Sequence, residues 1–127
     1  MIDIDLRTHL LSNSNICNMI GTSVYALRLP QNTNASAIVY DMGEGFAETQ
    51  VGSLETVVRH SVTLSVYSPS YGSMRQLTKH VTDHINGFNG AMGSTNVTGT
   101  YLVSTINTYE EESKLYRTLI LLNIFTN

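Results

Sequence analysis

Two histidines four positions apart are the residues of this chain best placed to bind a metal ion. In the segment HVTDH, a helix would bring His80 and His84 to one face at a spacing that zinc sites use, with Asp83 between them. The order follows an inverted zinc-protease motif, but Asp stands where that motif has the longer Glu, and no third ligand is evident. We therefore predict no metal site and keep a small metal-dependent hydrolase only as a remote alternative.

The other reactive residue types have no partners in any recognisable catalytic motif. His60 interrupts the apolar face of an expected strand, where a hydrogen-bonded core or interface histidine is the ordinary role and a general base the alternative. Cys17 is the only cysteine, so it forms no intramolecular disulfide, and we interpret it as a buried structural thiol. Gly43-Glu44-Gly45 lacks the third glycine and the helix of a nucleotide-binding loop, and we predict a turn there. The sequence thus predicts no catalytic residue and no cofactor.

The charge of the chain argues against direct recognition of nucleic acid. The 127 residues have a formal net charge of −3, only 13% of them are charged, and the Lys and Arg residues are scattered. A surface that grips phosphates needs clustered basic residues. Neutral surface can be buried against a partner without desolvating ions, so the composition favours a protein that works by assembly.

We expect neither export nor a membrane span. The longest plausible apolar run, residues 119–122, is far below the roughly 20 residues that cross a bilayer. The N-terminal segment MIDIDLRTHLL has acidic residues where a secretory signal has basic ones. The expectation is a single domain over residues 1–127 in a reducing, intracellular compartment.

Hydrophobic periodicity predicts an α+β domain. The clearest signals are the alternation of residue types at 57–67 and the apolar spacing of three and four along a helix from 70 to 88. A first helix is expected at 3–11, a second short helical turn capped by Ser14 and ended by Gly21, and further strands at 24–29, 37–42, 97–109 and 115–125. The predicted fold is an antiparallel sheet with two main helices packed on one face, in the order α-β-β-β-α-β-β.

The last two strands should form an antiparallel hairpin around the acidic run Glu110, Glu111 and Glu112. Both faces of the second strand are apolar at Leu119-Ile120-Leu121-Leu122, so one face can meet the helices while the other needs a different cover, which a neighbouring subunit could supply. The acidic run is either a solvated tip that prevents edge aggregation or a group that faces a channel or a basic partner.

Three segments together carry a resemblance to a known family. They are VYALRLPQ at 24–31 followed by AIVY at 37–40, the strand VTLSVY at 62–67 with the helix after it, and the terminal hairpin whose acidic tip leads into LYRTLIL at 115–121. In these segments the chain resembles the tail-completion, or tail-terminator, proteins of tailed bacteriophages, and the likeness extends from about Leu6 to Phe125. The chain departs from the family at 12–15, which is more polar, and at 43–53, which is long.

The resemblance implies a homohexameric ring of a structural virion protein, assembled in the host cytoplasm. Such a ring sits at the head-proximal end of the tail tube, stops tube polymerisation and docks to the head connector or neck, while DNA passes without specific binding. A head-completion or connector neck protein is the alternative. For the subunit or partner interface we select Arg28, Tyr67, Arg117, Leu119 and Leu121. For the surface facing the channel or a partner we select Glu110, Glu111 and Glu112.

Overall fold

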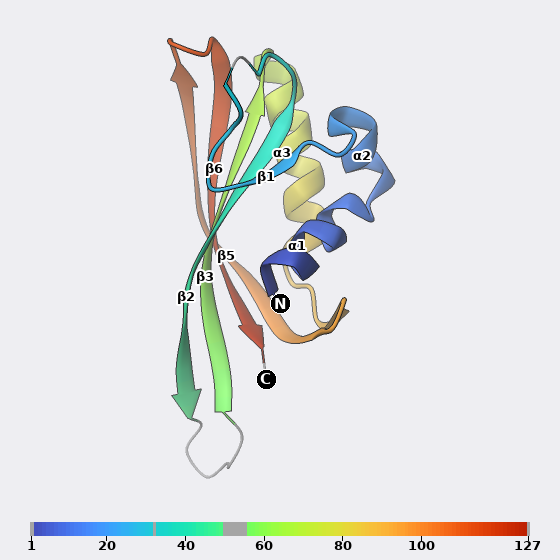
Figure 1. The fold of residues 1–127 in the computed structure, drawn as a ribbon, viewed down its shortest axis with the longest axis vertical. Coiled ribbons are helices and arrows are strands. Elements are labelled where there is room, and N and C mark those ends of the chain that lie inside the picture. Colours follow the sequence, from blue (N-terminus) through green and yellow to red (C-terminus); the bar gives the residue numbers. More distant parts are fainter. Residues whose placement is uncertain (1, 32, 50–55, 127) are drawn as a thin grey trace.

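The computed structural model describes the backbone of residues 2–31, 33–49 and 56–126 (Figure 1). A six-stranded sheet has the helices on one side, so the expected α+β class is confirmed. In chain order the elements are α1 (Ile2–Leu11), α2 (Ser14–Ile20), β1 (Val24–Ala26), β2 (Ala37–Thr49), β3 (Thr56–Ser68), α3 (Tyr71–Ile85), β4 (Gly90–Met92), β5 (Thr95–Glu110) and β6 (Leu115–Thr126).

The sheet has the strand order β1-β2-β3-β6-β5-β4, and it is mixed. Strands β1 and β2 run parallel, with Val24 opposite Ile38, whereas the other neighbours are antiparallel. The prediction of an antiparallel sheet is therefore wrong at this edge. Strand β1 ends at Ala26, before Leu27 with its φ of 68°, and so it is shorter than the strand expected at 24–29. The chain must return to the start of the sheet before β2 begins, and local patterns do not show such a return.

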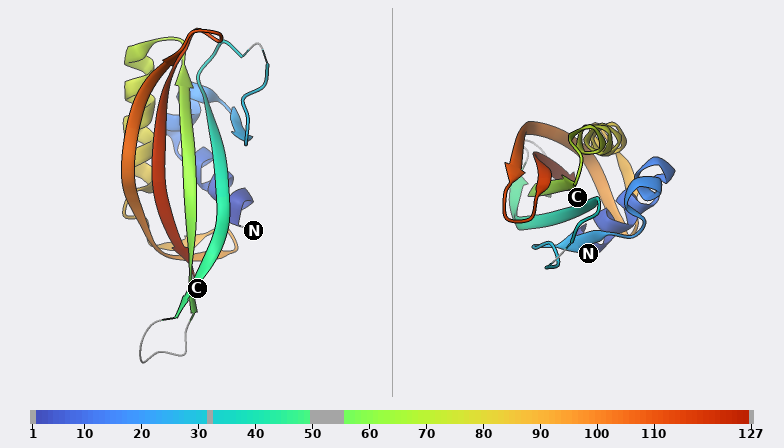
Figure 2. Two further views of the ribbon diagram at one scale, coloured as in Figure 1. Left: turned by 90° about the vertical axis from the view of Figure 1, so that its left-hand side faces the viewer. Right: turned by 90° about the horizontal axis from the view of Figure 1, so that it is seen from above.

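The helices cover one face of the sheet, and the described residues place no helix on the other face (Figure 2). Helix α3 begins where the Ser70 hydroxyl accepts a hydrogen bond from the Ser73 N–H at 3.4 Å, and its apolar stripe is buried as predicted. We call the sheet side that it covers the helix face. The buried strand residues of this core are Ile38, Tyr40, Val62, Leu64, Val66, Ile120, Leu122 and Ile124.

Three local expectations differ from the structure. Asn13 rather than Ser14 caps α2, because its side chain accepts from the N–H groups of Asn15 and Ile16. Helix α3 ends at Ile85, ahead of Gly87 with its φ of 77°. The chain then forms β4, a strand missing from the predicted order, because three residues are too short to show an alternating pattern.

Gly43-Glu44-Gly45 is not the predicted turn. Strand β2 continues through it to Thr49 with a bulge between Met42 and Gly45. A Cβ on Gly43 would lie 2.9 Å from the Ser61 carbonyl oxygen, so the close approach of β3 explains the glycine. The paired ends of β2 and β3 project from the body of the molecule (Figure 1). The sequence departs from the family by its length at 43–53, and residues 50–53 of that segment lie outside the described residues.

Candidate interaction surfaces

The sheet side without helices, which we call the open face, contains the odd-numbered residues of β6. The register places Leu119 between Ser65 of β3 and Ile106 of β5. It places Leu121 between Thr63 and Ser104 in the same way. The prediction of an antiparallel terminal hairpin with apolar residues on both faces is therefore confirmed.

One end of the open face is covered by the chain itself. Val39, Tyr67 and Leu115 are buried there in a small second cluster, against which Tyr25 and Leu29 pack. Leu29 belongs to the loop that follows β1, so this loop covers the open face around Leu115 and Tyr67, next to the Leu119–Leu122 segment for which a neighbour's cover was expected. Tyr67, selected as an interface residue, is only 8% exposed.

Beyond that loop the open face keeps an apolar surface, the open-face patch. Ile106 is 50% exposed and Tyr101 is 59% exposed, whereas Leu119 and Leu121 are only partly exposed. The ring of Tyr101 also meets that of Phe125 edge-on, at 5.6 Å between centroids. The open-face patch consists of Tyr101, Ile106, Leu119, Leu121 and Phe125.

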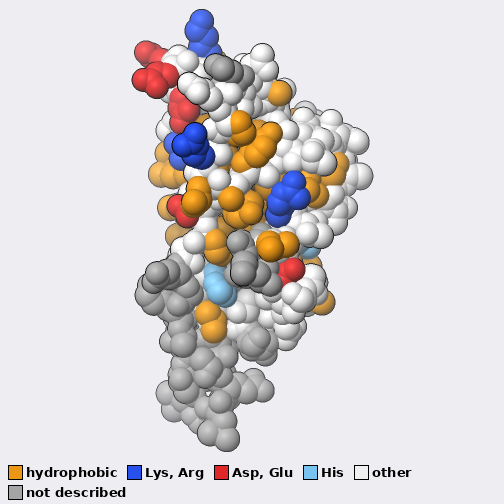
Figure 3. Space-filling model, viewed as in Figure 1, with side chains coloured by type: hydrophobic (Ala, Val, Ile, Leu, Met, Phe, Trp, Pro, Cys, Tyr) orange, Lys and Arg blue, Asp and Glu red, His pale blue; other side chains and the backbone are white. Residues whose placement is uncertain are grey.

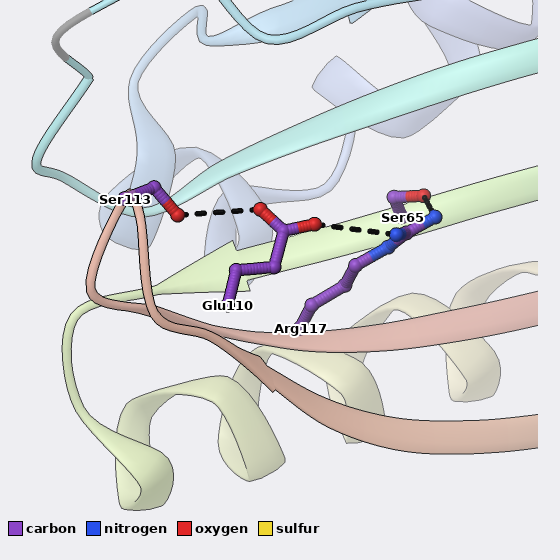
Figure 4. A network of polar contacts seen from close by, with 4 residues as sticks. All are labelled: Ser65, Glu110, Ser113 and Arg117. Carbon is purple, nitrogen blue, oxygen red and sulfur yellow. Dashed lines mark hydrogen bonds and ion pairs between the residues drawn. The ribbon is translucent and has the colours of Figure 1, made fainter.

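Arg117 joins three strands through one guanidinium group (Figure 4). It forms an ion pair with Glu110 Oε1 at 3.3 Å and donates to Ser65 Oγ at 3.2 Å. Its Cζ lies 5.7 Å from the centre of the Tyr67 ring. Burial raises the pKa of the Tyr67 hydroxyl, and the nearby guanidinium opposes that rise. Arg117 and Glu110, which were selected for different partners, thus contact each other within one subunit.

The acidic tip is built as an exposed turn. Glu111 and Glu112 are exposed between β5 and β6, whereas Glu110 accepts a hydrogen bond from Ser113 at 3.2 Å (Figure 4). Figure 3 shows acidic side chains gathered at this end of the molecule. A cleft of about 540 Å³ beside the tip is lined by Leu29, Pro30, Gln31, Thr33, Asn34, Glu110, Glu112 and Ser113.

Arg28 lies in the loop that follows β1, and it is not part of the open-face patch. It is exposed in the bend after β1, where its N–H donates to the Ala26 carbonyl at 2.8 Å. Arg28 and the exposed Glu111 and Glu112 thus stand apart, and the other selected residues fall into two groups. Leu119 and Leu121 lie on the open-face patch, whereas Arg117, Tyr67 and Glu110 form an internal network.

Three of the four histidines, His9, His60 and His84, are engaged in contacts within the fold. The His84 ring stacks on that of His9 at 4.2 Å between centroids, and its Nε2 lies 2.8 Å from the His9 carbonyl oxygen. Burial, followed by the proximity of His84, lowers the pKa of His9. His60 contacts Thr126 Oγ1 at 3.2 Å, as expected of a hydrogen-bonded histidine, and burial lowers its pKa. Within the described ranges, no group of three or more His, Cys, Asp and Glu residues could hold a metal.

Cys17 and the helices add no functional site. The Cys17 thiol, which is partly buried, donates to the Leu11 carbonyl at 2.8 Å, consistent with a structural role. Among the helices of the described residues, none is long and apolar enough to cross a membrane.

Sequence reasoning missed the exposed apolar residues of β5. These residues are Tyr101, Leu102, Val103, Ile106 and Tyr109. Three consecutive apolar residues at 101–103 were the available signal, because a strand with one buried face alternates. A bulge between Leu102 and Ser104 interrupts that alternation and places part of the apolar surface on each face.

Comparison with known proteins identifies a family. A family model described as Tail completion protein gp17 matches residues 4–127. Among solved structures, a chain from the virion of a native gene transfer agent (GTA) particle has a similar fold, with a TM-score of 0.72. It is 13% identical, and the likeness covers 94% of this chain and 89% of that one. Comparison with curated proteins finds no match.

The family model spans nearly all of the chain, so the resemblance inferred from three segments is confirmed. Members of this family are structural virion proteins, which also confirms the prediction that the chain is not an enzyme. The chain belongs to the family of Tail completion protein gp17 and is a structural component of a phage virion.

Proposed function

We propose that this protein, as one domain, forms a homohexameric ring at the head-proximal end of a phage tail tube. The ring ends tube polymerisation and docks the tail to the head connector or neck. The observation that carries the proposal is the open-face patch, because a sheet whose second face exposes Ile106 and Tyr101 is incomplete as a monomer. A neighbouring subunit or a tube subunit completes it.

The charge of the chain suits a ring through which DNA passes. Its net charge is −3, and the exposed tip carries Glu111 and Glu112. A lumen of this sign repels the phosphate backbone and leaves the duplex free to move. We place the tip at the channel or at a partner in the neck.

Deleting the gene tests the proposed role. Without a terminator, tube assembly has no stop, so tails of irregular length that fail to join heads are expected under the electron microscope. Complementation with the intact gene should restore tails of one length. Tails of normal length that join heads without this protein would refute the proposal.

Tails purified without heads separate the proposal from its alternative. A tail terminator remains on the isolated tail, and mass measurement should give about six copies at one end. A head-completion or connector neck protein would remain with the head instead. The family description as a tail completion protein favours the first outcome.

A further inference from the structure

Most of the outer edge of β5 has no neighbouring strand among the described residues. Strand β4 pairs with β5 only at Thr95–Val97. The segment that leaves α3 occupies the next part of the edge. Gly87 N–H donates to the Thr100 carbonyl at 2.9 Å, and Leu102 N–H donates to Asn86 Oδ1 at 3.2 Å. The free part of the edge therefore begins after Leu102.

Three residues present their backbone groups outward along this free part. The alternation that turns the Leu102 N–H outward continues, after the bulge, at Thr105, Asn107 and Tyr109. Their N–H and C=O groups form a template to which a further strand can pair. Their side chains lie on the helix face, since Thr105 is opposite the buried Ile120 of β6. An added strand would therefore have one set of side chains beside α3.

A basic groove lies on the helix face between α3 and this edge, which forms the margin of the sheet in front of α3 in the left view of Figure 2. The groove has a volume of about 530 Å³ and is lined from β5 by Leu102 and Thr105. From α3, its charged lining residues are Arg75 and Lys79, and both are exposed. They lie one turn apart on the same flank of the helix. Asp83, the acidic residue of α3, does not line the groove. An acidic side chain therefore suits this groove.

An apolar cleft lies next to the basic groove, toward the β5–β6 tip. It has a volume of about 230 Å³, and its lining includes Tyr71, Met74, Asn107, Tyr109 and Tyr116. Tyr71 is 53% exposed and Tyr109 is 48% exposed. Both of their rings meet the Tyr116 ring, at 5.8 Å and 4.8 Å between centroids. The rings hold one another in place, so the cleft is ready to receive an apolar side chain.

A second copy of this chain is a poor occupant of the same edge. An antiparallel pairing of two β5 edges would bring Thr105, Asn107 and Tyr109 of the second copy to the groove, and none of these is acidic. It would also turn the Arg75 and Lys79 pairs of the two copies toward each other, and like charges oppose such a contact. Strand β1, at the opposite margin of the sheet, has the sequence VYA and no carboxylate.

We propose that the free edge of β5 docks an extended segment of a different virion protein. The segment pairs with β5 as an added strand, places an apolar side chain in the tyrosine cleft and places a carboxylate beside Arg75 and Lys79. Backbone pairing supplies affinity, and the two side-chain sites supply selectivity. The cleft and the groove follow each other along β5, so the apolar and acidic residues of the partner are about four positions apart.

This docking site goes beyond the proposed ring. It lies on the helix face and the outer edge of β5, whereas the contact proposed for the ring uses the open-face patch. It depends on the chain being a virion component, which the family assignment supports. Tail length reports on the ring separately, so a failure of this docking site and a failure of the ring are distinguishable.

Photo-crosslinking in complete virions tests which segment occupies the groove. A benzophenone amino acid replaces Gln76, which is exposed in the groove, and in a control variant it replaces Asn18 on α2. Mass spectrometry should map the adduct from position 76 to a different virion protein, at a segment with apolar and acidic residues about four positions apart. The control should not give this adduct. An adduct to a second copy of this chain, or to a segment without an acidic residue, would overturn the proposal.

A matched pair of substitutions tests the added strand. Thr105→Pro removes one outward N–H without removing a bond of the subunit's own sheet, whereas Thr105→Ala keeps this N–H. Loss of one hydrogen bond should lower the crosslink yield at position 76 about tenfold in Thr105→Pro. The yield of Thr105→Ala should stay close to that of the wild type, and far-UV circular dichroism should show both variants folded. Equal yields from the two folded variants would mean that the partner does not pair as a strand.

Charge exchange tests the groove without a proline. Lys79→Glu should lower the crosslink yield about tenfold. Replacing the crosslinked carboxylate of the partner by Lys should then restore the yield, because opposite charges again face each other. Asn18→Asp adds a negative charge outside the groove and should leave the yield unchanged. A wild-type yield from Lys79→Glu, or no recovery with the exchanged partner, would refute the role of the groove.

Discussion

Replacing Ile106 by Asp should block assembly and leave the subunit folded. Ile106 is 50% exposed on the open face, so about half of its side chain remains to be buried by a partner. Complete burial of such a side chain is worth about 1.5–3 kcal/mol, so burial of the exposed half by a partner contributes about 1 kcal/mol to each subunit contact. A carboxylate left without a partner in that contact adds about 2 kcal/mol. Together these effects weaken each contact about 150-fold.

The cost to the isolated subunit is much smaller. Asp in a strand costs up to about 1 kcal/mol, and β5 is exposed on its outer edge at this position. The same change at Leu121 is a poorer test, because Leu121 lies on the inner strand β6 and is mostly buried. Leu121→Asp, like Leu119→Asp, should therefore lower subunit stability as well as assembly.

The assay compares tail incorporation with folding in the same preparation. The amount of Ile106→Asp protein on purified tails should fall to background, while its free energy of unfolding from urea titration stays within about 1 kcal/mol of the wild type. Asn18→Asp adds the same charge on an exposed helix position and should assemble normally. Normal incorporation of folded Ile106→Asp protein would show that the open-face patch is not an interface.

Three further predictions concern the subunit. Arg117→Ala should lower the free energy of unfolding by about 1–2 kcal/mol, because Glu110 loses its cation. This figure already allows for the partial exposure of the ion pair to solvent. An unchanged urea midpoint would contradict this role. The lowered pKa of His9 means that the unfolded chain binds the proton first, so stability should be full above about pH 6.5 and fall below it. His60 titrates in the same direction, so His9→Phe should reduce this slope without abolishing it; an identical slope would exclude His9. Leu64→Ala should cost about 2–5 kcal/mol by calorimetry, since Leu64 is fully buried, and a loss below 1 kcal/mol would mean that the core repacks there.

Local patterns predicted most of the elements because each depends on nearby residues. The spacing of Met74, Leu77 and Val81 requires a helix with one buried stripe, and the alternation around Val62 and Leu64 requires a strand with one buried face. The repeat of side-chain direction along a helix or a strand is a property of the backbone, so it can be recognised without knowing which elements pack against it. The parallel pairing of β1 with β2 could not be read in this way, because it depends on where a loop returns.

The selected site residues show the same division. The sequence identified Leu119 and Leu121 as apolar residues facing away from the core, and the structure places both on the open face. It could not show that Leu29 covers Tyr67, or that Arg117 reaches Glu110 and Ser65, because these contacts join separate strands and a loop. Long side chains find their partners only when tertiary structure brings the strands together.

The sequence by itself determined that this chain is an α+β protein with a terminal hairpin, apolar on both faces of its last strand, and no catalytic constellation. Composition, period and residue type are sufficient for those conclusions. Only the tertiary structure decided how the two faces are covered and which edges stay free. The physical reason is that pairing satisfies backbone groups between distant segments, so the edges that β1 and β4 cover only in part among the described residues are defined only once all six strands have their places.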